Sequence, residues 1–255
     1  MKLSIIMPAY NEEKRLKPTL DAYAPYFAGY FGSEAELLVI VNGSRDRTED
    51  VARNCAIRWP QIRVIVEPRK VGKGGAIMLG FAQATGDLIG FVDADGATQP
   101  PAFHDLVKNI GDAGCIIASR WIPGAVVSPK QPLKRRIASR IFNWLVRALF
   151  KVNIHDTQCG AKLCSGAAAK RVLPLLGLTR WAFDVDLLFQ LRRCGFSIIE
   201  VPTVWQDVGG SQLQVGRAST EMFIAIVRLR LLHSPLRFIV TIYDRTLGRA
   251  ARVKP

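Results

Sequence analysis

Short apolar runs alternate with helix-length segments over the first 120 residues of the chain. Runs of four to eight apolar residues are typical of buried strands, and apolar positions recurring every three or four residues are typical of helices. Strands are therefore expected at 3–7, 36–41, 63–67, 88–93 and 115–119. Helices are expected from residue 12 into 23–27, and at 48–57, 74–84 and 101–110. This alternation predicts an α/β fold whose mostly parallel, twisted sheet is covered by helices on both faces.

The second half of the chain mixes basic and large apolar residues at helical spacing. One predicted helix face carries Arg136, Arg140, Asn143, Arg147 and Lys151. A neighbouring stripe is apolar and consists of Ile137, Ile141, Trp144, Leu145 and Ala148. Such a helix can lie flat in a membrane interface, or it can be a surface helix that packs its apolar side on the core. Residues 222–232, followed by the apolar residues of 236–240, form a second candidate for lying flat.

No repeat, low-complexity tract or linker divides the 255 residues. We expect one domain at 1–217 and a membrane-associating extension of amphipathic helices at 218–255. Mean hydropathy is high at +0.14, but charged residues interrupt every stretch of about 18 residues, so no spanning helix is expected. The apolar start is too short for a signal peptide and ends at Pro8. Five cysteines without a CxxC pair favour reduced thiols in the cytoplasm.

The formal net charge of +14 indicates an acidic partner, which can be nucleic acid, anionic lipid or a phosphorylated substrate. No acidic residue lies between Asp112 and Asp156, whereas eight Lys and Arg residues do. Because large apolar residues are interspersed among them, these basic residues favour a membrane surface or a lipid phosphate. The chain has no base-stacking aromatic motif and no zinc pattern, so no nucleic-acid partner is expected.

The richest motif comprises residues 93–98, Asp-Ala-Asp-Gly-Ala-Thr, which follow the apolar run 88–92. Two carboxylates, Asp93 and Asp95, are thereby placed where a buried strand opens into a loop. Ligands bind at this carboxyl edge in α/β sheets. Carboxylates that lie this close repel one another unless a cation joins them, and Mg²⁺ or Mn²⁺ bound to a diphosphate is the usual cation. The alternative is a pair of loop aspartates that caps the helix after Pro100.

Three more polar loops are predicted at the same edge. They follow the first three strands and comprise residues 8–13, 42–46 and 70–76. Glycine in such loops lets the backbone approach a ligand, and the start of a helix offers free N–H groups to anionic oxygens. Lys73 adds a point charge suited to phosphate. Each loop alone can be explained by turn chemistry or helix capping, but four such loops at one edge favour a ligand site.

These motifs resemble those of the family 2 glycosyltransferases, which have the Rossmann-like GT-A fold. The resemblance rests on Pro-Ala-Tyr-Asn-Glu at 8–12, Gly-Lys-Gly-Gly-Ala at 72–76 and the motif at 93–98. Within that family the chain resembles the branch of dolichyl- and polyprenyl-phosphate glucosyltransferases and mannosyltransferases. Segments 156–163, 180–188 and 205–211 point to the glucosyl side. The similarity extends in order from Leu3 to about Arg230.

The resemblance implies sugar transfer from a nucleotide sugar, with Asp93, Asp95 and Asp184 at the catalytic centre. Asp93 and Asp95 would hold Mg²⁺ or Mn²⁺ on the diphosphate. The nucleotide sugar would be bound by Pro8, Tyr10, Glu12, Asn42, Lys73, Gly74 and Asp93. Two departures matter: the chain has Val41-Asn42 where the family commonly has paired aspartates, and Ala97 where some mannosyl relatives have a polar metal ligand. The cation would therefore depend more on Asp95, diphosphate and water.

The resemblance also implies that Arg120, Arg135 and Ser139 bind the phosphate of a lipid acceptor. A phosphate monoester is already ionised at neutral pH, so it needs cations more than it needs a general base. Asp156 and Asp184 stay open, because either can orient the donor sugar or the basic loop. If the acceptor were a sugar hydroxyl, a carboxylate near Asp184 would act as the base.

We therefore expect a metal-dependent, inverting hexosyltransferase that moves glucose from UDP-glucose onto a polyprenyl or dolichyl phosphate. It would bind peripherally to an anionic membrane surface, on the cytoplasmic face. One alternative is a mannosyl or other hexosyl transferase that uses GDP-mannose or another donor. Another is a family 2 transferase that acts on a glycan hydroxyl. From a different class, a basic nucleic-acid-binding protein is the third alternative.

Overall fold

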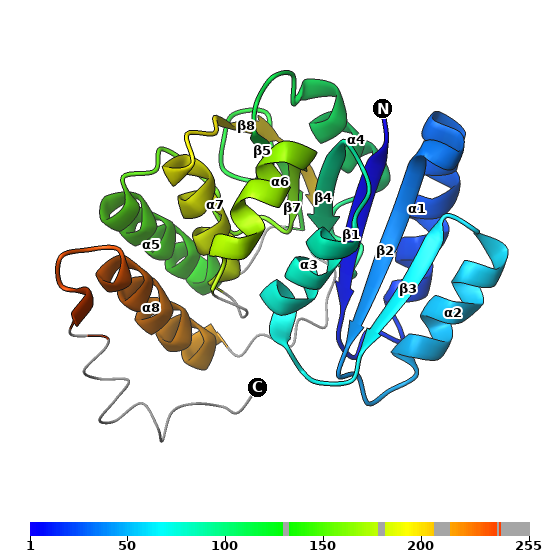
Figure 1. Ribbon diagram of the computed structural model, residues 1–255, viewed down its shortest axis with the longest axis horizontal. Coiled ribbons are helices and arrows are strands. Elements are labelled where there is room, and N and C mark those ends of the chain that lie inside the picture. The colour runs from blue at the N-terminus through cyan, green and yellow to red at the C-terminus, as the bar shows by residue number, and fades with distance from the viewer. Residues whose placement is uncertain (130–132, 178–181, 207–214, 239, 241–255) are drawn as a thin grey trace.

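The computed structural model, shown in Figure 1, describes residues 1–129, 133–177, 182–206, 215–238 and 240. Side chains at 134, 135 and 215–220 are outside this description. Seven strands form one sheet in the order β3-β2-β1-β4-β7-β5-β8. Their bounds are β1 Leu3–Ala9, β2 Ala35–Asn42, β3 Ile62–Glu67, β4 Leu88–Val92, β5 Cys115–Ser119, β7 Ala161–Ser165 and β8 Ile198–Pro202. Only β7 runs antiparallel to its neighbours, so the expected mostly parallel α/β sheet is confirmed.

Helices cover both faces of the sheet (Figure 1). The described helices are α1 Leu16–Phe31, α2 Thr48–Arg58, α3 Gly72–Gln83, α4 Pro100–Asn109, α5 Leu133–Phe150, α6 Gly166–Val172, α7 Phe183–Arg193 and α8 Val215–Leu232. Short 3₁₀ turns follow α1 and α6, at Gly32–Glu34 and Leu173–Leu175. Two short strands, β6 Val126–Ser128 and β9 Val204–Gln206, pair in parallel beside the main sheet.

Two hydrophobic clusters form the core, one on each face of the sheet. Helices α1, α2 and α4 pack on one face, and α3 with α5–α8 pack on the other. The period of two along a strand explains this division, because neighbouring side chains point to opposite faces. In β1, for example, Ile5 and Met7 belong to the first cluster and Ile6 belongs to the second.

The five strands expected from the sequence are present, each within a residue or two of its expected ends. The helix expected from residue 12 begins later, at Leu16, because residues 11–15 form a turn that contacts the second strand-end loop. Strand β7 was not expected. It lies between β4 and β5 and runs antiparallel to both.

Helix α5 has an inner face on the core and an outer face that is apolar. Val146 and Phe150 are buried, whereas Ile137, Ile141 and Trp144 are 50%, 55% and 66% exposed. Leu145 of the predicted stripe packs partly against the core, so the helix buries one part of that stripe and exposes the other. Asn143 also departs from the pattern, because it was placed with the arginines and is in fact buried.

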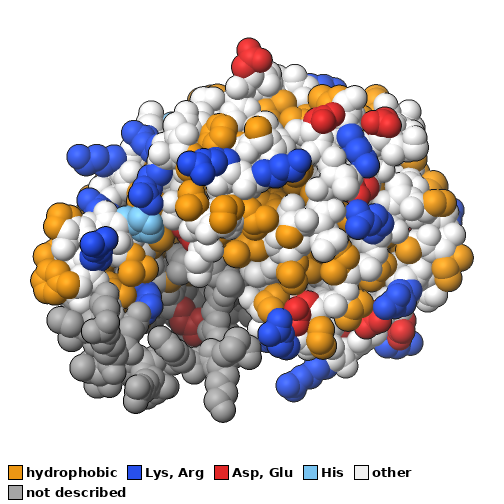
Figure 2. Space-filling model, in the orientation of Figure 1, with side chains coloured by type: hydrophobic (Ala, Val, Ile, Leu, Met, Phe, Trp, Pro, Cys, Tyr) orange, Lys and Arg blue, Asp and Glu red, His pale blue; other side chains and the backbone are white. Residues whose placement is uncertain are grey.

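Helix α8 packs beside α5 on the same face of the sheet. Its Ile226 and Leu229 are buried in the core, and Arg230 Nε donates to the Leu149 carbonyl of α5 at 2.9 Å. Outward it exposes Phe223 and Ile224. Figure 2 shows Lys and Arg side chains interspersed with hydrophobic ones over the half that holds α5–α8. Among the described residues, no helix is long and apolar enough to cross a membrane.

Candidate active site

The first four parallel strands, β3, β2, β1 and β4, end at one edge of the sheet, and the four loops that follow them contact each other. The first and second loops are joined by hydrogen bonds from Asn11 N to Ser44 Oγ at 3.1 Å and from Glu12 N to Thr48 Oγ1 at 2.7 Å. The first and third meet where Lys70 Nζ lies 3.9 Å from the Tyr10 ring centroid. The expected gathering of these four loops is therefore observed, with the loop after β4 joined through Lys73 and Asp93.

The loop after β4 is held in shape by its own turn and by α1. Asp95 Oδ1 accepts a hydrogen bond from Ala97 N at 3.0 Å, and Gly96 has a φ of +76°, which favours glycine. From α1, Thr19 Oγ1 donates to the Ala94 carbonyl and Tyr23 Oη donates to the Thr98 carbonyl. Helix α4 receives no side-chain cap at its start, so the capping alternative for the aspartate pair does not hold.

Asp93 and Asp95 share a carboxylate-rich environment. Burial and the neighbouring Asp93 carboxylate raise the pKa of Asp95. Burial also raises the pKa of Glu12, although Arg15 forms a two-bond ion pair with it. Gly160 is needed beside them, because a Cβ there would lie 2.0 Å from Asp93 Oδ2. The arrangement brings carboxylates together, and a bound cation would reduce the repulsion between them.

Lys73 connects these carboxylates to Asp184 on α7. Its Nζ lies 2.7 Å from Asp93 Oδ1 and 3.9 Å from Asp184 Oδ2. Although burial alone would lower the pKa of Lys73, Asp93 and Asp184 raise it, so the ammonium stays charged. The other Asp184 oxygen, Oδ1, accepts from Lys162 Nζ at 2.5 Å. Both oxygens of Asp184 therefore face ammonium groups.

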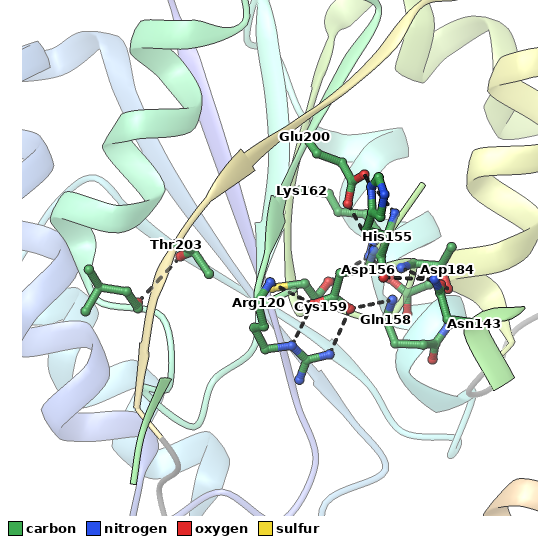
Figure 3. Close-up of polar contacts among 12 residues, drawn as sticks. Arg120, Asn143, His155, Asp156, Gln158, Cys159, Lys162, Asp184, Glu200 and Thr203 are labelled. Atoms are coloured by element: carbon green, nitrogen blue, oxygen red, sulfur yellow. Dashed lines mark hydrogen bonds and ion pairs between the residues drawn. The ribbon is translucent and has the colours of Figure 1, made fainter. Parts of the chain in front are cut away.

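A second ion pair lies where β5 ends (Figure 3). Arg120 Nε and Nη2 donate to the two carboxylate oxygens of Asp156 at 2.7 and 2.9 Å, and the Arg120 backbone N–H adds a bond of 3.0 Å. Burial would lower the pKa of Arg120, but Asp156 outweighs it and raises that pKa. From β8, Glu200 accepts from the backbone N–H of Asp156 at 3.0 Å and of His155 at 2.7 Å.

The remaining site residues expected from sequence have varied surroundings. Asn42 is buried and donates to the Ala9 carbonyl, while its Oδ1 has no hydrogen-bond partner among the described residues. Gly74 makes room for α7, since a Cβ there would lie 2.5 Å from Phe183 Cβ. Pro8 lies in β1 beside Ile40, and Ser139 is half-buried on α5. The side chain of Arg135 lies outside the described residues, as do Arg180, Trp181 and residues 207–211 of the motifs.

Lys162 and Glu200, which contact Asp184 and the loop of Asp156, are among the charged residues that had no expected role. Lys162 has no exposed surface, lies in β7, and also donates to the Cys159 carbonyl at 2.7 Å. A lysine in a strand ordinarily predicts an exposed position, and the only sequence signal against this was its place within the 156–163 motif. Glu200 is in a strand that was not expected, and no local pattern marks it.

Comparison of the fold with solved structures finds glycosyltransferases. Glucosyl-3-phosphoglycerate synthase from Mycobacterium tuberculosis, solved with Mn²⁺, UDP and phosphoglyceric acid, superposes with a TM-score of 0.65. The alignment covers 90% of this chain and 78% of that one, at 20% sequence identity. The complex of the same enzyme with Mn²⁺ and UDP-glucose gives a TM-score of 0.66. This likeness establishes the GT-A fold.

Sequence comparison identifies nearer relatives. A dolichyl-phosphate beta-glucosyltransferase of Trichomonas vaginalis is 33% identical over 237 residues, covering 89% of this chain and 70% of that protein. The enzyme of the same name from Dictyostelium discoideum is 34% identical, covering 89% and 73%. The human one is 33% identical, covering 83% and 69%. The model of Glycosyl transferase family 2 matches residues 4–173, about two thirds of the chain. The protein therefore belongs to glycosyl transferase family 2.

Proposed function

We propose that the protein transfers glucose from UDP-glucose to a dolichyl or other polyprenyl phosphate, with inversion at the anomeric carbon. The observation that carries this proposal is the similarity of 33–34%, over most of the chain, to enzymes named dolichyl-phosphate beta-glucosyltransferase. The geometry agrees with two charged substrates. One group of ionised residues surrounds Asp93 and Asp95, and a separate buried arginine, Arg120, lies at the end of β5.

The donor would bind over the loops after β1 to β4. Tyr10 and Asn42 are the residues that the resemblance assigns to the nucleotide, and Asn42 Oδ1, which has no hydrogen-bond partner within the described part of the chain, supports that assignment as a free acceptor. Lys73 is positioned by Asp93 to neutralise charge on the departing diphosphate. Uridine as the base is supported by the relatives that act on glucose and by the solved UDP complexes of the fold neighbour.

Asp93 and Asp95 fit a divalent cation of the Mg²⁺ or Mn²⁺ type. Asp93 and Asp95 flank Ala94 at the end of β4, the neighbouring Asp93 carboxylate helps to raise the pKa of Asp95, and hard cations prefer such oxygen ligands. No group of three or more His, Cys, Asp or Glu side chains in the described part of the chain makes a complete metal centre. The diphosphate and water would therefore supply the other ligands. When bound, the cation would neutralise charge that develops on the leaving diphosphate.

The acceptor phosphate would be held by Arg120, with Ser139 and Arg135 contributed by α5. An oxygen of that phosphate forms a bond to the anomeric carbon while the bond from this carbon to UDP breaks, and the electron pair leaves with UDP. No proton has to be removed from an ionised phosphate. Because both oxygens of Asp184 face ammonium groups, this residue is better placed to fix Lys73 than to accept a proton.

The outer side of α5 and α8 supports work at a membrane surface. Exposed apolar side chains of α5 (Ile137, Ile141 and Trp144) and of α8 (Phe223 and Ile224) lie on the basic half of the molecule. Such a combination suits helices that lie in the interface of an anionic membrane. We propose peripheral binding to the cytoplasmic leaflet, with residues 218–255 contributing to it.

The test is a donor and acceptor screen with purified protein, read by mass spectrometry. UDP-glucose with a polyprenyl phosphate should give a polyprenyl phosphate glucose, whereas GDP-mannose should give little product. A preference for GDP-mannose would overturn the donor assignment. Transfer to a glycan hydroxyl but not to a lipid phosphate would overturn the acceptor assignment, and binding of nucleic acid without any transfer would overturn both.

A further inference from the structure

Asn143, labelled in Figure 3, is buried on the inner face of α5, and its amide makes four hydrogen bonds. Nδ2 donates to the carbonyl oxygens of Ile154 at 3.1 Å and His155 at 2.8 Å. Oδ1 accepts from Thr157 N at 3.2 Å and from Thr157 Oγ1 at 2.9 Å. These four bonds use both donors and both acceptor sites of a primary amide. The amide orientation is therefore fixed, and all its partners lie in the loop 154–157.

The loop that Asn143 holds carries Asp156, the partner of Arg120. Hydrogen bonds from Asn143 lie on both sides of Asp156 along the chain, and Glu200 accepts from the backbone N–H of Asp156 itself. The carboxylate is thus fixed by its backbone, from α5 on one side and from β8 on the other. Its two oxygens in turn fix the guanidinium of Arg120.

The opposite side of the same helix is the proposed membrane surface. Trp144, the next residue after Asn143, is 66% exposed, and Ile141 is 55% exposed. One turn earlier, Arg140 Cζ lies 5.1 Å from the ring centroid of Trp121, the residue that follows Arg120. Helix α5 thus contacts the loop 154–157 through Asn143 on its inner side and Trp121 through the exposed Arg140, while its outer side also carries apolar side chains for a lipid surface.

We propose that Asn143 is a positioning residue that couples the outward helix α5 to Arg120 through the loop 154–157. The inference rests on the proposed function, in which Arg120 receives the acceptor phosphate. Other inner-face positions of α5, such as Val146 and Phe150, use apolar packing, which does not fix an orientation. An amide at 143 fixes the loop by directional bonds, so the position of α5 sets the position of Arg120.

The experiment compares acceptor use with donor binding in the full-length protein. Asn143→Asp keeps the size but replaces the amide donors with an acceptor that repels two carbonyls, so the loop should shift. We expect the KM for polyprenyl phosphate in anionic vesicles to rise about tenfold, the equivalent of ~1.4 kcal/mol. The affinity for UDP-glucose, measured by calorimetry, and the flotation of the protein with the vesicles should stay within twofold of wild type.

A pair of substitutions at Thr157 tests the same coupling with less risk of misfolding. Thr157→Val removes one hydroxyl bond to Asn143 at nearly constant shape and should raise the acceptor KM about threefold, whereas Thr157→Ser keeps the hydroxyl and should restore it. The control is Asn153→Ala. It removes an exposed bond between the same helix and the same stretch of chain, from Arg147, and should leave both KM values unchanged.

The Arg120→Lys variant distinguishes a failure of the acceptor assignment from a failure of the coupling alone. If Arg120→Lys leaves the acceptor KM unchanged, the acceptor assignment fails and the coupling falls with it. If Arg120→Lys raises the acceptor KM but neither Asn143→Asp nor Thr157→Val does, the function stands and the coupling is wrong. An equal loss of donor affinity in Asn143→Asp would also overturn the coupling, because a general structural role would then explain the effect.

Discussion

At the scale of single residues, acidic and basic side chains alternate around Asp93, and we expect them to affect both stability and activity. Glu12, Asp93, Asp95 and Asp184 are accompanied by Arg15, Lys73 and Lys162, so one more carboxylate than basic group is present. The excess negative charge favours binding of a cation. Removal of any of the basic side chains would leave a carboxylate without a compensating charge.

Lys162→Met should destabilise the protein by about 3 kcal/mol, because it leaves the buried Asp184 carboxylate without its nearest ammonium. The additional change Asp184→Asn should recover part of that loss, since the charge left without a partner is removed. Chemical denaturation measures both. Lys108→Met, which removes an exposed pair with Asp105, is the matched control and should change stability by less than about 0.5 kcal/mol. Equal effects of the two methionine variants would contradict the buried pairing.

Asp95→Asn should abolish most activity while the fold is kept. Burial and the Asp93 carboxylate raise the pKa of Asp95, so its ionisation is less favourable in the folded protein than in the unfolded chain. Replacing it with a neutral amide should therefore leave the melting temperature the same or raise it. The loss of a charged metal ligand should lower kcat/KM at least ~100-fold. Titration with Mn²⁺ followed by paramagnetic resonance should show weaker binding, and undiminished Mn²⁺ affinity would refute the assignment.

At the scale of elements, one buried glutamate joins the strands at the edge away from the site. Glu36 of β2 accepts from Ser4 of β1, from Arg63 of β3 and from Thr85 ahead of β4. Burial would raise the pKa of Glu36, but these hydrogen bonds outweigh it and lower the pKa to about 2. A lowered pKa means stability that is present above about pH 4.5 and is lost as the pH falls towards 2.

Glu36→Gln should therefore destabilise the protein by about 2 kcal/mol at pH 7, since an amide replaces an ionised acceptor of several hydrogen bonds. The difference from wild type should shrink between pH 4.5 and pH 2, where the wild-type carboxylate becomes protonated. Denaturation at pH 7 and pH 3 measures this. Glu49→Gln, on an exposed pair with Arg53, should have little effect at either pH. A constant difference across both pH values would contradict the ionised network.

The elements also show what the sequence predicts and where it fails. Strands β1 to β4 and their loops follow from local patterns, because each strand is an apolar run and each loop has turn chemistry. Strand β7 could not be predicted in this way, since Lys162 interrupts a run of only five residues. The strands that pair with β7 are also distant from it in sequence. Asn143 was misplaced for a related reason: helical spacing groups residues by angle, but its burial depends on partners in the loop 154–157.

At the scale of the whole molecule, apolar exposure and positive charge lie on the same half. We expect the protein to float with anionic vesicles at low salt, partly through charge and partly through burial of Ile141 and Trp144. The double variant Ile141→Ser/Trp144→Gln should reduce flotation and, unlike wild type, should be released fully by high salt. Ile57→Ser changes an 84% exposed side chain on α2 and is the control, expected to float as wild type does. Wild-type protein that stays at the bottom would contradict membrane binding.

The position of β7 in the sheet determines the order in which strands can pair while the chain is being synthesised. While the ribosome is still adding residues before 161, one edge of β4 has no partner, because β5 pairs with β7 and β8 rather than with β4. The edge of β4 therefore stays unpaired until β7 is synthesised, and an unpaired strand edge can associate with other chains. Gly160 and Lys162 arrive with the same segment, beside Asp93 and Asp184. The same segment thus covers the open edge of β4 and brings Lys162 to the sheet before α7 and β8 are made, and a chain released before residue 161 would lack both.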